Sequence, residues 1–226
     1  TVNVSNNYIS DLRHAGSNAD GIRGIGITNS TASTSYNLYF NTIYLNATTS
    51  QATFGTTGLY HTSSATATTV ALNLRNNIIV NVSAPGSTAG LTVAFRRNNA
   101  TLANYVSGAT GSNNNVFYAG TPSASNLLYY DPTNTNVQTL AAFQTLVTPR
   151  ETASLSTMPQ FMDITATPYN LHLKLNANCA VSDAGTPIAG YTDDFDGDIR
   201  NVTTPDIGAD EFTATTKLIF TAKENG

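Results

Sequence analysis

Short runs in which apolar and polar residues alternate recur along the first 120 residues of the chain. They occupy residues 2–9, 36–43, 72–79 and 113–117, and each contains an asparagine that is followed two positions later by an apolar residue. Alternation with a period of two is typical of strands that bury one face. We therefore predict that each run forms half-buried strand structure.

An asparagine stands at the same place in every run. A second series of apolar runs lies between them and begins at residues 21, 58, 90 and 126, with steps of 37, 32 and 36 residues. Two interleaved series with similar periods indicate one structural unit that is repeated with loops of variable length. The asparagines are separated by 34, 36 and 38 positions, and they are Asn7, Asn41, Asn77 and Asn115.

No helix is expected between these strands, because residues 46–57 and 62–70 are rich in threonine, serine, alanine and asparagine. Strands that recur without helices bury their apolar faces by stacking on their own equivalents. We therefore predict an all-β fold, a parallel β-helix (β-solenoid) of about five or six turns. The repeated turns would occupy residues 1–135.

The repeated asparagines would form a column at a tight bend of such a stack. Asparagine tolerates a left-handed backbone at that place, and its amide can bond to the next turn. The alternative is that asparagine is simply a common turn residue in this sequence. We predict a structural asparagine ladder made by Asn7, Asn41, Asn77 and Asn115.

The last third of the chain has a different organisation. Residues 137–144 have the spacing of a short amphipathic helix, and Leu140 and Phe143 would share one face with Leu146, which follows that range. Further segments follow at residues 159–161, 169–173, 184–185, 194–200 and 206–212. The end of a solenoid exposes apolar core and unpaired strands, so we predict that residues 136–212 cap one end. No equivalent cap is evident at the N-terminal end.

This ordered string of segments carries a family resemblance. With DFDGDIR at residues 194–200 and DIGADEF at residues 206–212, it resembles the closing region of right-handed parallel β-helices of the pectate-lyase-like superfamily. The likeness is greatest to secreted or cell-surface β-helix proteins of Bacteroidota-type bacteria, and it covers residues 135–212. The chain departs from that family at residues 178–182, where Asn-Cys-Ala-Val-Ser replaces the usual Ser-Pro-Ala. The resemblance implies a right-handed solenoid that is extracellular or on a bacterial cell surface.

Composition limits the partners of this chain. Charged residues make up 11% of the 226 residues, and the formal net charge is −4. Nucleic acid is therefore not an expected partner, because sequence-independent binding to it needs a basic face. No apolar run is long enough to span a membrane. Cys179 is the single cysteine, so no disulfide forms within the chain.

An acidic loop near the C-terminus is the candidate metal site. Alternating carboxylates around a glycine are typical of calcium loops, and Ca²⁺ is the one cofactor that the sequence suggests. In the structural alternative the first two carboxylates accept backbone N–H groups in a turn, and Arg200 pairs with Asp206 or Asp210. The candidate calcium ligands are Asp194, Asp196 and Asp198.

The second strand series contains the candidate glycan-binding residues, Arg23, Tyr60 and Arg96. On the outside of neighbouring turns they would form a groove for acidic sugars. In lyases of the resembled family, arginine or lysine acts as the base and calcium on the wall neutralises the substrate. That chemistry needs a base and a group that stabilises the enolate, yet residues 15–130 contain Asp20 as their single acid and no lysine. A polysaccharide lyase is therefore the alternative function, and no catalytic residue is predicted.

The three histidines do not have the sequence spacing of a zinc site. His172 lies in a Leu-His-Leu strand, so its side chain is expected to face solvent. His61 follows Leu59 and Tyr60 in a repeat strand and is expected on the wall of the solenoid. No zinc site is predicted from these positions.

A strand-like heptamer at residues 217–223 lies within a tail or linker at residues 213–226, with Leu218, Ile219 and Phe220 at its apolar centre. Such a strand can add to the sheet edge of another copy. Together with an open N-terminal end, it would allow head-to-tail filaments. The expected partners are therefore a second copy of the chain or an extracellular glycan. The predicted function is an extracellular structural or adhesive module without catalytic activity.

Overall fold

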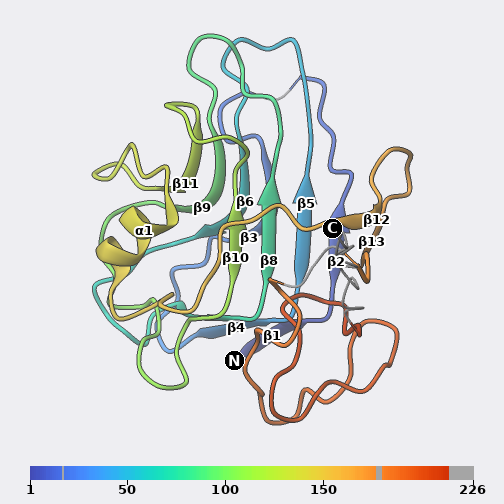
Figure 1. Cartoon of the computed structure of the whole chain (residues 1–226). Helices are drawn as coiled ribbons and strands as arrows, with labels where there is room; N and C mark the ends of the chain where they lie inside the picture. The colour runs from blue at the N-terminus through green and yellow to red at the C-terminus, as the bar shows by residue number, and fades with distance from the viewer. Residues whose placement is uncertain (17, 177–179, 214–226) are drawn as a thin grey trace, which may run out of the picture.

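The computed structural model describes residues 1–16, 18–176 and 180–213. The chain winds through successive turns, and each of the first three turns contributes three strands (Figure 1). The fourth turn contributes two. The strands are β1 (Val2–Ser5), β2 (Tyr8–Ser10), β3 (Ile22–Ile27), β4 (Ser35–Tyr39), β5 (Thr42–Leu45), β6 (Thr56–His61), β7 (Ala71–Arg75), β8 (Ile78–Asn81), β9 (Thr92–Arg97), β10 (Val116–Tyr118) and β11 (Asn126–Tyr130).

Equivalent strands of successive turns pair in parallel and build three sheets. Sheet A has the order β1-β4-β7, sheet B the order β10-β8-β5-β2, and sheet C the order β11-β9-β6-β3. One register is kept along each sheet, so that Asn3 pairs with Asn37, which pairs with Asn73. The all-β parallel solenoid predicted from the alternating runs is thus confirmed.

The solenoid has about four turns, fewer than the five or six expected. The chain after β11 does not add another complete turn, because it forms a helix and a long segment that lies beside the sheets. Among the described residues no helix is long and apolar enough to cross a membrane.

The inward side chains of the sheets form apolar columns along the axis of the solenoid. Ile43 and Ile79 are register neighbours in sheet B, and Leu59 and Phe95 are register neighbours in sheet C. All four are buried in the main hydrophobic cluster. Full burial of such a side chain stabilises the fold by roughly 1.5–3 kcal/mol relative to exposure. The core is therefore continuous from turn to turn.

The helix α1 (Leu140–Val147) covers the end of the stack next to β11 (Figure 1). The ring of Phe143 is fully buried, and its centre lies 5.1 Å from that of Tyr129. The hydroxyl of Thr139 caps the helix by accepting a backbone N–H of the first turn at 3.3 Å, an arrangement that stabilises helix starts. The amphipathic helix expected at residues 137–144 is thus present, shifted by three residues.

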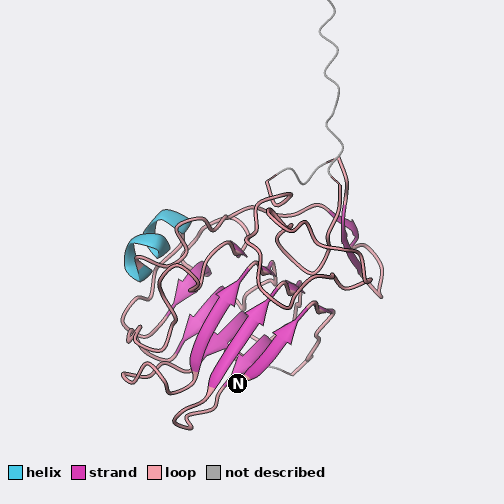
Figure 2. Cartoon of the chain, turned by 90° about the horizontal axis from the view of Figure 1, so that it is seen from below, coloured by secondary structure: helices cyan, strands magenta, loops and turns pink. Residues whose placement is uncertain are grey.

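The described residues from Leu155 onward do not cover the end of the stack. We call residues 155–213 the covering segment. It starts at Leu155, which bridges Val116 of β10, and it runs back along sheet B toward the first turn (orange to red in Figure 1). It contains an antiparallel pair, β12 (Phe161–Asp163) and β13 (Asn170–Leu173). This pair and α1 lie on opposite sides of the sheets (Figure 2).

The covering segment packs on the outer face of sheet B through a second apolar cluster. The prediction that all of residues 136–212 cap the end is therefore wrong for the larger part of that region. The strands of sheet B are apolar on both faces, so their outer face needs a cover as much as the end does. The cluster joins Tyr44, Ile78, Val80 and Val116 of sheet B to Phe161, Leu171, Leu173, Val181 and Ile207 of the covering segment.

Candidate functional site

The structure brings the predicted glycan-binding residues together on the outer face of sheet C. Tyr60 and Arg96 are register neighbours in β6 and β9. Arg23 of β3 places its guanidinium carbon 3.7 Å from the centre of the Tyr60 ring, and Arg96 lies over Tyr130 at 4.4 Å. We call these four residues, together with the neighbouring Asp20, the arginine–tyrosine wall.

Asp20 offsets part of the positive charge of this wall. Its Oδ2 accepts two hydrogen bonds from Arg23, at 2.6 and 3.0 Å, and its Oδ1 lies 3.5 Å from Nε of Arg96. The hydroxyl of Thr57 also donates to this carboxylate. Burial lowers the pKa of Arg96 below its usual value, and Asp20 opposes this change. An anionic ligand would therefore compete with Asp20, and Arg23 already covers one face of Tyr60.

The four repeated asparagines form a continuous hydrogen-bond ladder at the bend between sheets A and B. The Nδ2 group of Asn7 donates to Oδ1 of Asn41 at 2.8 Å, Asn41 donates to Asn77 at 2.9 Å, and Asn77 donates to Asn115 at 3.0 Å. The ladder side chains also donate to main-chain carbonyls, as Asn77 does to Leu38 at 2.8 Å. The side-chain amides of Asn7, Asn41 and Asn77 thus each donate a hydrogen bond to the next asparagine along the stack.

The ladder ends on Glu151, which sequence reasoning missed. Nδ2 of Asn115 donates to its Oε2 at 2.9 Å, and the hydroxyls of Tyr105 and Ser154 donate to the same carboxyl group. Burial raises the pKa of Glu151 from its usual 4.5. The repeat gave no signal for it, because the bridge between Val116 and Leu155 places Ser154, not Glu151, in register with Asn115.

The left-handed backbone at this bend falls one residue before each ladder asparagine. The φ angle is 54° at Asn6, 55° at Phe40 and 56° at both Asn76 and Asn114. The expectation that the ladder asparagines themselves adopt this conformation is therefore wrong. The preceding residue turns the corner, so that the asparagine side chain after it points along the stack and reaches the next turn.

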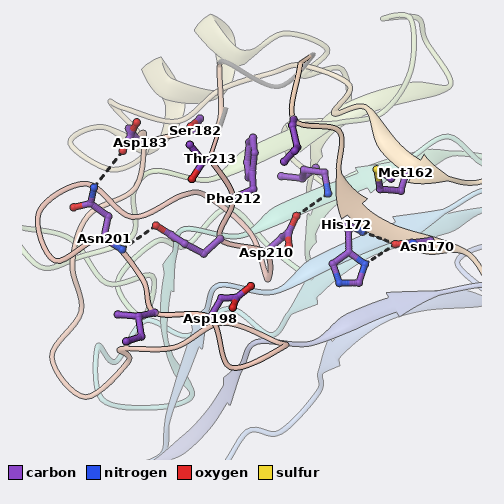
Figure 3. A pocket seen from close by; sticks show the side chains of 14 residues that line it. Met162, Asn170, His172, Ser182, Asp183, Asp198, Asn201, Asp210, Phe212 and Thr213 are labelled. Atoms are coloured by element: carbon purple, nitrogen blue, oxygen red, sulfur yellow. Dashed lines mark hydrogen bonds between the residues drawn. The ribbon is translucent and has the colours of Figure 1, made fainter. Parts of the chain in front are cut away.

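A hollow of about 1020 Å³ lies in the covering segment and is the second candidate site (Figure 3). The strand β13 contributes His172 and Asn170 to its lining, and Met162 and Phe212 supply apolar surface. The hollow is acidic, so it suits a cation better than an acidic sugar. Its carboxyl groups belong to Asp183, Asp198, Asp210 and Glu211.

The predicted calcium ligands are not brought together at one point. Oδ1 of Asp194 accepts the N–H groups of Asp196 and Asp198 at 2.8 and 2.9 Å, and its Oδ2 accepts that of Glu211 at 2.9 Å. Asp196 instead reaches His172, whose Nε2 lies 2.6 Å from its Oδ2. Asp194 therefore holds the turn, as in the structural alternative, while Asp196 reaches His172.

Arg200 joins the covering segment to the first two turns. Its guanidinium pairs with Glu211 at 3.3 Å and donates to Oδ1 of Asn6 and to the carbonyl of Gly208, both at 3.1 Å. The guanidinium carbon also lies 4.0 Å from the centre of the Phe40 ring. A planar donor fork of this kind can hold several acceptors at fixed angles. Arg200 is thus the main polar anchor between the loop at residues 194–200 and the solenoid.

The expected pairing of Arg200 with Asp206 or Asp210 is wrong, because both of these aspartates accept backbone N–H groups. Asp206 accepts two, at 2.6 and 2.7 Å, and Asp210 accepts that of Leu173 at 2.7 Å. Burial raises the pKa of Asp206 to about 6 and also raises that of Asp210 from its usual 3.8. These two carboxyl groups therefore link the stability of the covering segment to pH.

The histidines lie in three different environments. His14 is exposed. His61 is buried rather than on the outer wall: its Nε2 bonds to the carbonyl of Val70 at 2.7 Å, and Arg97 donates to its Nδ1 at 3.3 Å. Burial lowers the pKa of His61 to about 3, so its ring is neutral at physiological pH. His172 is half-buried, so the expectation that it faces solvent is only partly right.

Known proteins do not identify this chain: no family model, no curated protein and no solved structure matches it. The class that its fold defines is the parallel β-solenoid. The predicted assembly residues Leu218, Ile219 and Phe220 lie outside the described residues, as does Cys179. The function therefore has to be argued from the solenoid, the arginine–tyrosine wall and the covering segment.

Proposed function

We propose that the chain is an extracellular structural or adhesive β-solenoid module without catalytic activity. We assign it to the pectate-lyase-like superfamily, among the secreted or cell-surface proteins of Bacteroidota-type bacteria. The observation that carries the proposal is the asymmetry of the stack. Among the described residues, the helix α1 covers one end, whereas β1, β2 and β3 carry the outermost edges of their sheets at the other. Unpaired edges of parallel sheets are templates for another strand.

The side chains of the first described turn support strand addition at this edge. Val2 is 48% exposed, and Val4, Ile9 and Ile25 are only half-buried although they pack on the core. The equivalents of Val4, Ile9 and Ile25 in the next turn are at most 1% exposed, and they are Leu38, Ile43 and Leu59. A second copy that adds a strand here would complete the burial of this apolar end. Residues 217–223, outside the described residues, are the strand that we propose for it.

The use of charged groups supports a non-catalytic role. In the arginine–tyrosine wall, both guanidinium groups face Asp20. In the covering segment, Asp194, Asp206 and Asp210 accept backbone N–H groups. A lyase needs a base that is free to take a proton and a group that neutralises the enolate. These side chains are instead engaged in holding the fold.

The arginine–tyrosine wall is the proposed adhesive surface for an extracellular acidic glycan. The side chain of Arg23 is 32% exposed, and its stacking on Tyr60 holds the planar guanidinium in place. A fixed guanidinium suits a carboxylate of an acidic sugar, which would displace Asp20 from it. Adhesion and assembly are compatible, because this wall lies on the side of the stack and the open edges lie at its end.

Negative-stain electron microscopy and light scattering of the full chain test the assembly. We expect regular filaments, and we expect Val2→Lys to abolish them, because lysine on an edge strand opposes strand addition. Ile199→Lys is the control, because Ile199 is 82% exposed and lies in the covering segment. If the chain stays monomeric, binding to an immobilised acidic polysaccharide that Arg23→Ala removes would still support the adhesive role. A chain that does neither contradicts the proposal.

A polysaccharide lyase is the second candidate, favoured by one observation. Arg23, Arg96 and the carboxylate of Asp20 cluster on one outer face. The assay is the ultraviolet absorbance of an unsaturated uronate product from an acidic polysaccharide, with and without calcium. We expect no product. Turnover that Arg96→Ala abolishes would replace the structural proposal by the lyase.

A further inference from the structure

Three side chains of the covering segment converge although they are far apart in the sequence. His172 comes from β13, Asp196 from the loop at residues 194–200, and Asp210 from the segment at residues 206–212. Each offers one ligand atom, and these atoms all lie within 4.8 Å of one another. Within the part of the chain that the structure describes, this is the single group of its kind among histidine, cysteine and acidic residues.

The imidazole of His172 faces an oxygen atom at each nitrogen. Its Nδ1 lies 2.5 Å from Oδ1 of Asn170, and the same Oδ1 accepts the backbone N–H of His172 at 3.1 Å, which identifies it as the amide oxygen. Nδ1 therefore carries a proton, and Nε2 faces Asp196, whose Oδ2 is 2.6 Å away. A positive charge, either a proton or a metal ion, must lie between these two electron-rich atoms.

The side chains around this group are held in place by hydrogen bonds and ring contacts. Oδ2 of Asp210 accepts the N–H of Leu173 at 2.7 Å, which leaves its other oxygen for a ligand. The hydroxyl oxygen of Tyr8 is buried without a hydrogen-bond partner. The Tyr8 ring lies 4.5 Å from that of Phe195 and 5.1 Å from that of His172. Burial raises the pKa of Tyr8, and the charges of Asp210 and Asp196 raise it further.

We propose that His172, Asp196 and Asp210 bind a divalent transition-metal ion of the zinc type. One imidazole nitrogen with two carboxylate oxygens is a ligand set that zinc accepts, whereas calcium prefers oxygen ligands alone. The contact from Nδ1 of His172 to Asn170 is the outer hydrogen bond that orients metal-binding histidines. Ligand distances of about 2.0–2.1 Å would separate Nε2 and the Asp196 oxygen to about 3.3 Å. The buried Tyr8 hydroxyl is placed to meet the ion or a water bound to it.

The ion would hold separate parts of the covering segment together. Its three ligands lie on separate parts of that segment, and Tyr8 belongs to β2 in the first turn. Binding to the folded chain alone raises its apparent stability in proportion to the logarithm of the metal concentration. The inference does not depend on the proposed function, because a stabilising metal ion is compatible with an enzyme and with a structural module.

Isothermal titration calorimetry with Zn²⁺ on the metal-stripped full chain tests this site. We expect one Zn²⁺ per chain, no displacement by excess Ca²⁺ or Mg²⁺, and a rise in Tm with Zn²⁺. His172→Ala and Asp196→Asn should each weaken binding by at least about tenfold. Asp196 is exposed, so its substitution leaves the fold intact. The controls are His14→Ala and Asp198→Asn, which remove an exposed histidine and a neighbouring carboxylate outside the group.

The outcomes separate a built site from incidental contacts. Absence of Zn²⁺ binding to the wild-type chain would overturn the proposal. So would Zn²⁺ binding that His172→Ala and Asp196→Asn leave unchanged, or that His14→Ala abolishes. Calcium binding that depends on Asp194 and Asp198 would instead restore the calcium loop expected from the sequence. In the supported case, the Tm rise is lost in the two ligand variants and kept in both controls.

Discussion

Asn77 lies next to Asn41 in the following turn of the stack and accepts two hydrogen bonds from it. Oδ1 of Asn77 accepts the backbone N–H of Asn41 at 3.0 Å and its side-chain amide at 2.9 Å. Both residues are at most 1% exposed. At this corner the backbone groups cannot form sheet hydrogen bonds and water does not reach them. The repeated asparagines therefore supply the hydrogen bonds that these buried polar groups need.

Asn77→Ala should lower the free energy of unfolding by about 2–4 kcal/mol, because it leaves buried partners such as the N–H of Asn41 unsatisfied. Asn37→Ala is the matched control. Asn37 also bonds to an asparagine of the neighbouring turn, but that contact is exposed, so we expect less than about 1 kcal/mol. Urea unfolding measures both, and equal losses would show that the ladder adds nothing to stability.

Glu151→Ala should cost roughly 3–5 kcal/mol, because it removes the acceptor of Asn115 and of two buried hydroxyls at the end of the ladder. Glu151→Gln keeps one acceptor oxygen and the shape of the side chain, so it should cost clearly less. Thermal and urea unfolding compare the two variants. A glutamine variant as unstable as the alanine variant would contradict this account of the ladder end.

Gly58→Ala should destabilise the solenoid by about 1–3 kcal/mol through overpacking. A Cβ at this position would lie 2.6 Å from Cγ2 of Ile79 and 2.7 Å from the carbonyl oxygen of Ala94. Gly26→Ala in the same sheet is the control, because its Cβ would meet no atom closer than 3.6 Å. Calorimetric Tm values should fall for the first variant and stay within about a degree or two for the second.

Arg200→Lys keeps the charge but loses the planar fork that holds Glu211, Asn6 and the carbonyl of Gly208. We expect faster amide hydrogen exchange across residues 193–212 and unchanged exchange in sheet C. Arg13→Lys is the control, because the partners of Arg13, which are Asp11 and Tyr169, lie outside residues 193–212. Uniformly faster exchange in all three sheets would mean that Arg200 serves the whole fold rather than the covering segment.

The pKa of Asp206 makes a prediction about pH. Burial raises it to about 6 in the folded chain, from 3.8. The folded state therefore binds this proton more tightly, and the resulting stability is present below the unfolded pKa and is lost as pH rises through about 6. Between about pH 4 and 7, the urea midpoint should fall less steeply in Asp206→Asn than in the wild type, whatever the absolute stability of the variant. Parallel pH profiles would contradict this.

Much of the solenoid could be predicted from the sequence, because each strand repeats a pattern whose partner lies one turn away. The spacing of Asn7, Asn41 and Asn77 equals the pairing register of the sheets, so the ladder followed from it. The path of the covering segment could not be predicted from the sequence. Its apolar residues, such as Ile207, fit the end or the wall of a solenoid equally well, and only the packing against Ile78 and Val80 distinguishes the two.

The candidate sites also differ in how far the sequence predicts them. Arg23, Tyr60 and Arg96 lie in repeat strands, so the repeat itself brought them together. His172, Asp196 and Asp210 lie in loops and a hairpin that do not repeat, and no local spacing indicates that they meet. Asp194 has the sequence of a calcium ligand, but its oxygens are taken by backbone N–H groups, which a sequence pattern does not distinguish from metal contacts.

The covering segment touches both extremes of the stack, since Leu155 bridges Val116 in the fourth turn and Arg200 bonds Asn6 in the first. Neighbouring strands of a sheet are about 4.8 Å apart, so these anchors span a set number of strand spacings. A duplicated turn between them would separate the anchors by one more spacing. The covering segment therefore fixes the number of turns between its two anchors and disfavours the gain or loss of an internal repeat. The corner loops already differ in length, so they can accept insertions.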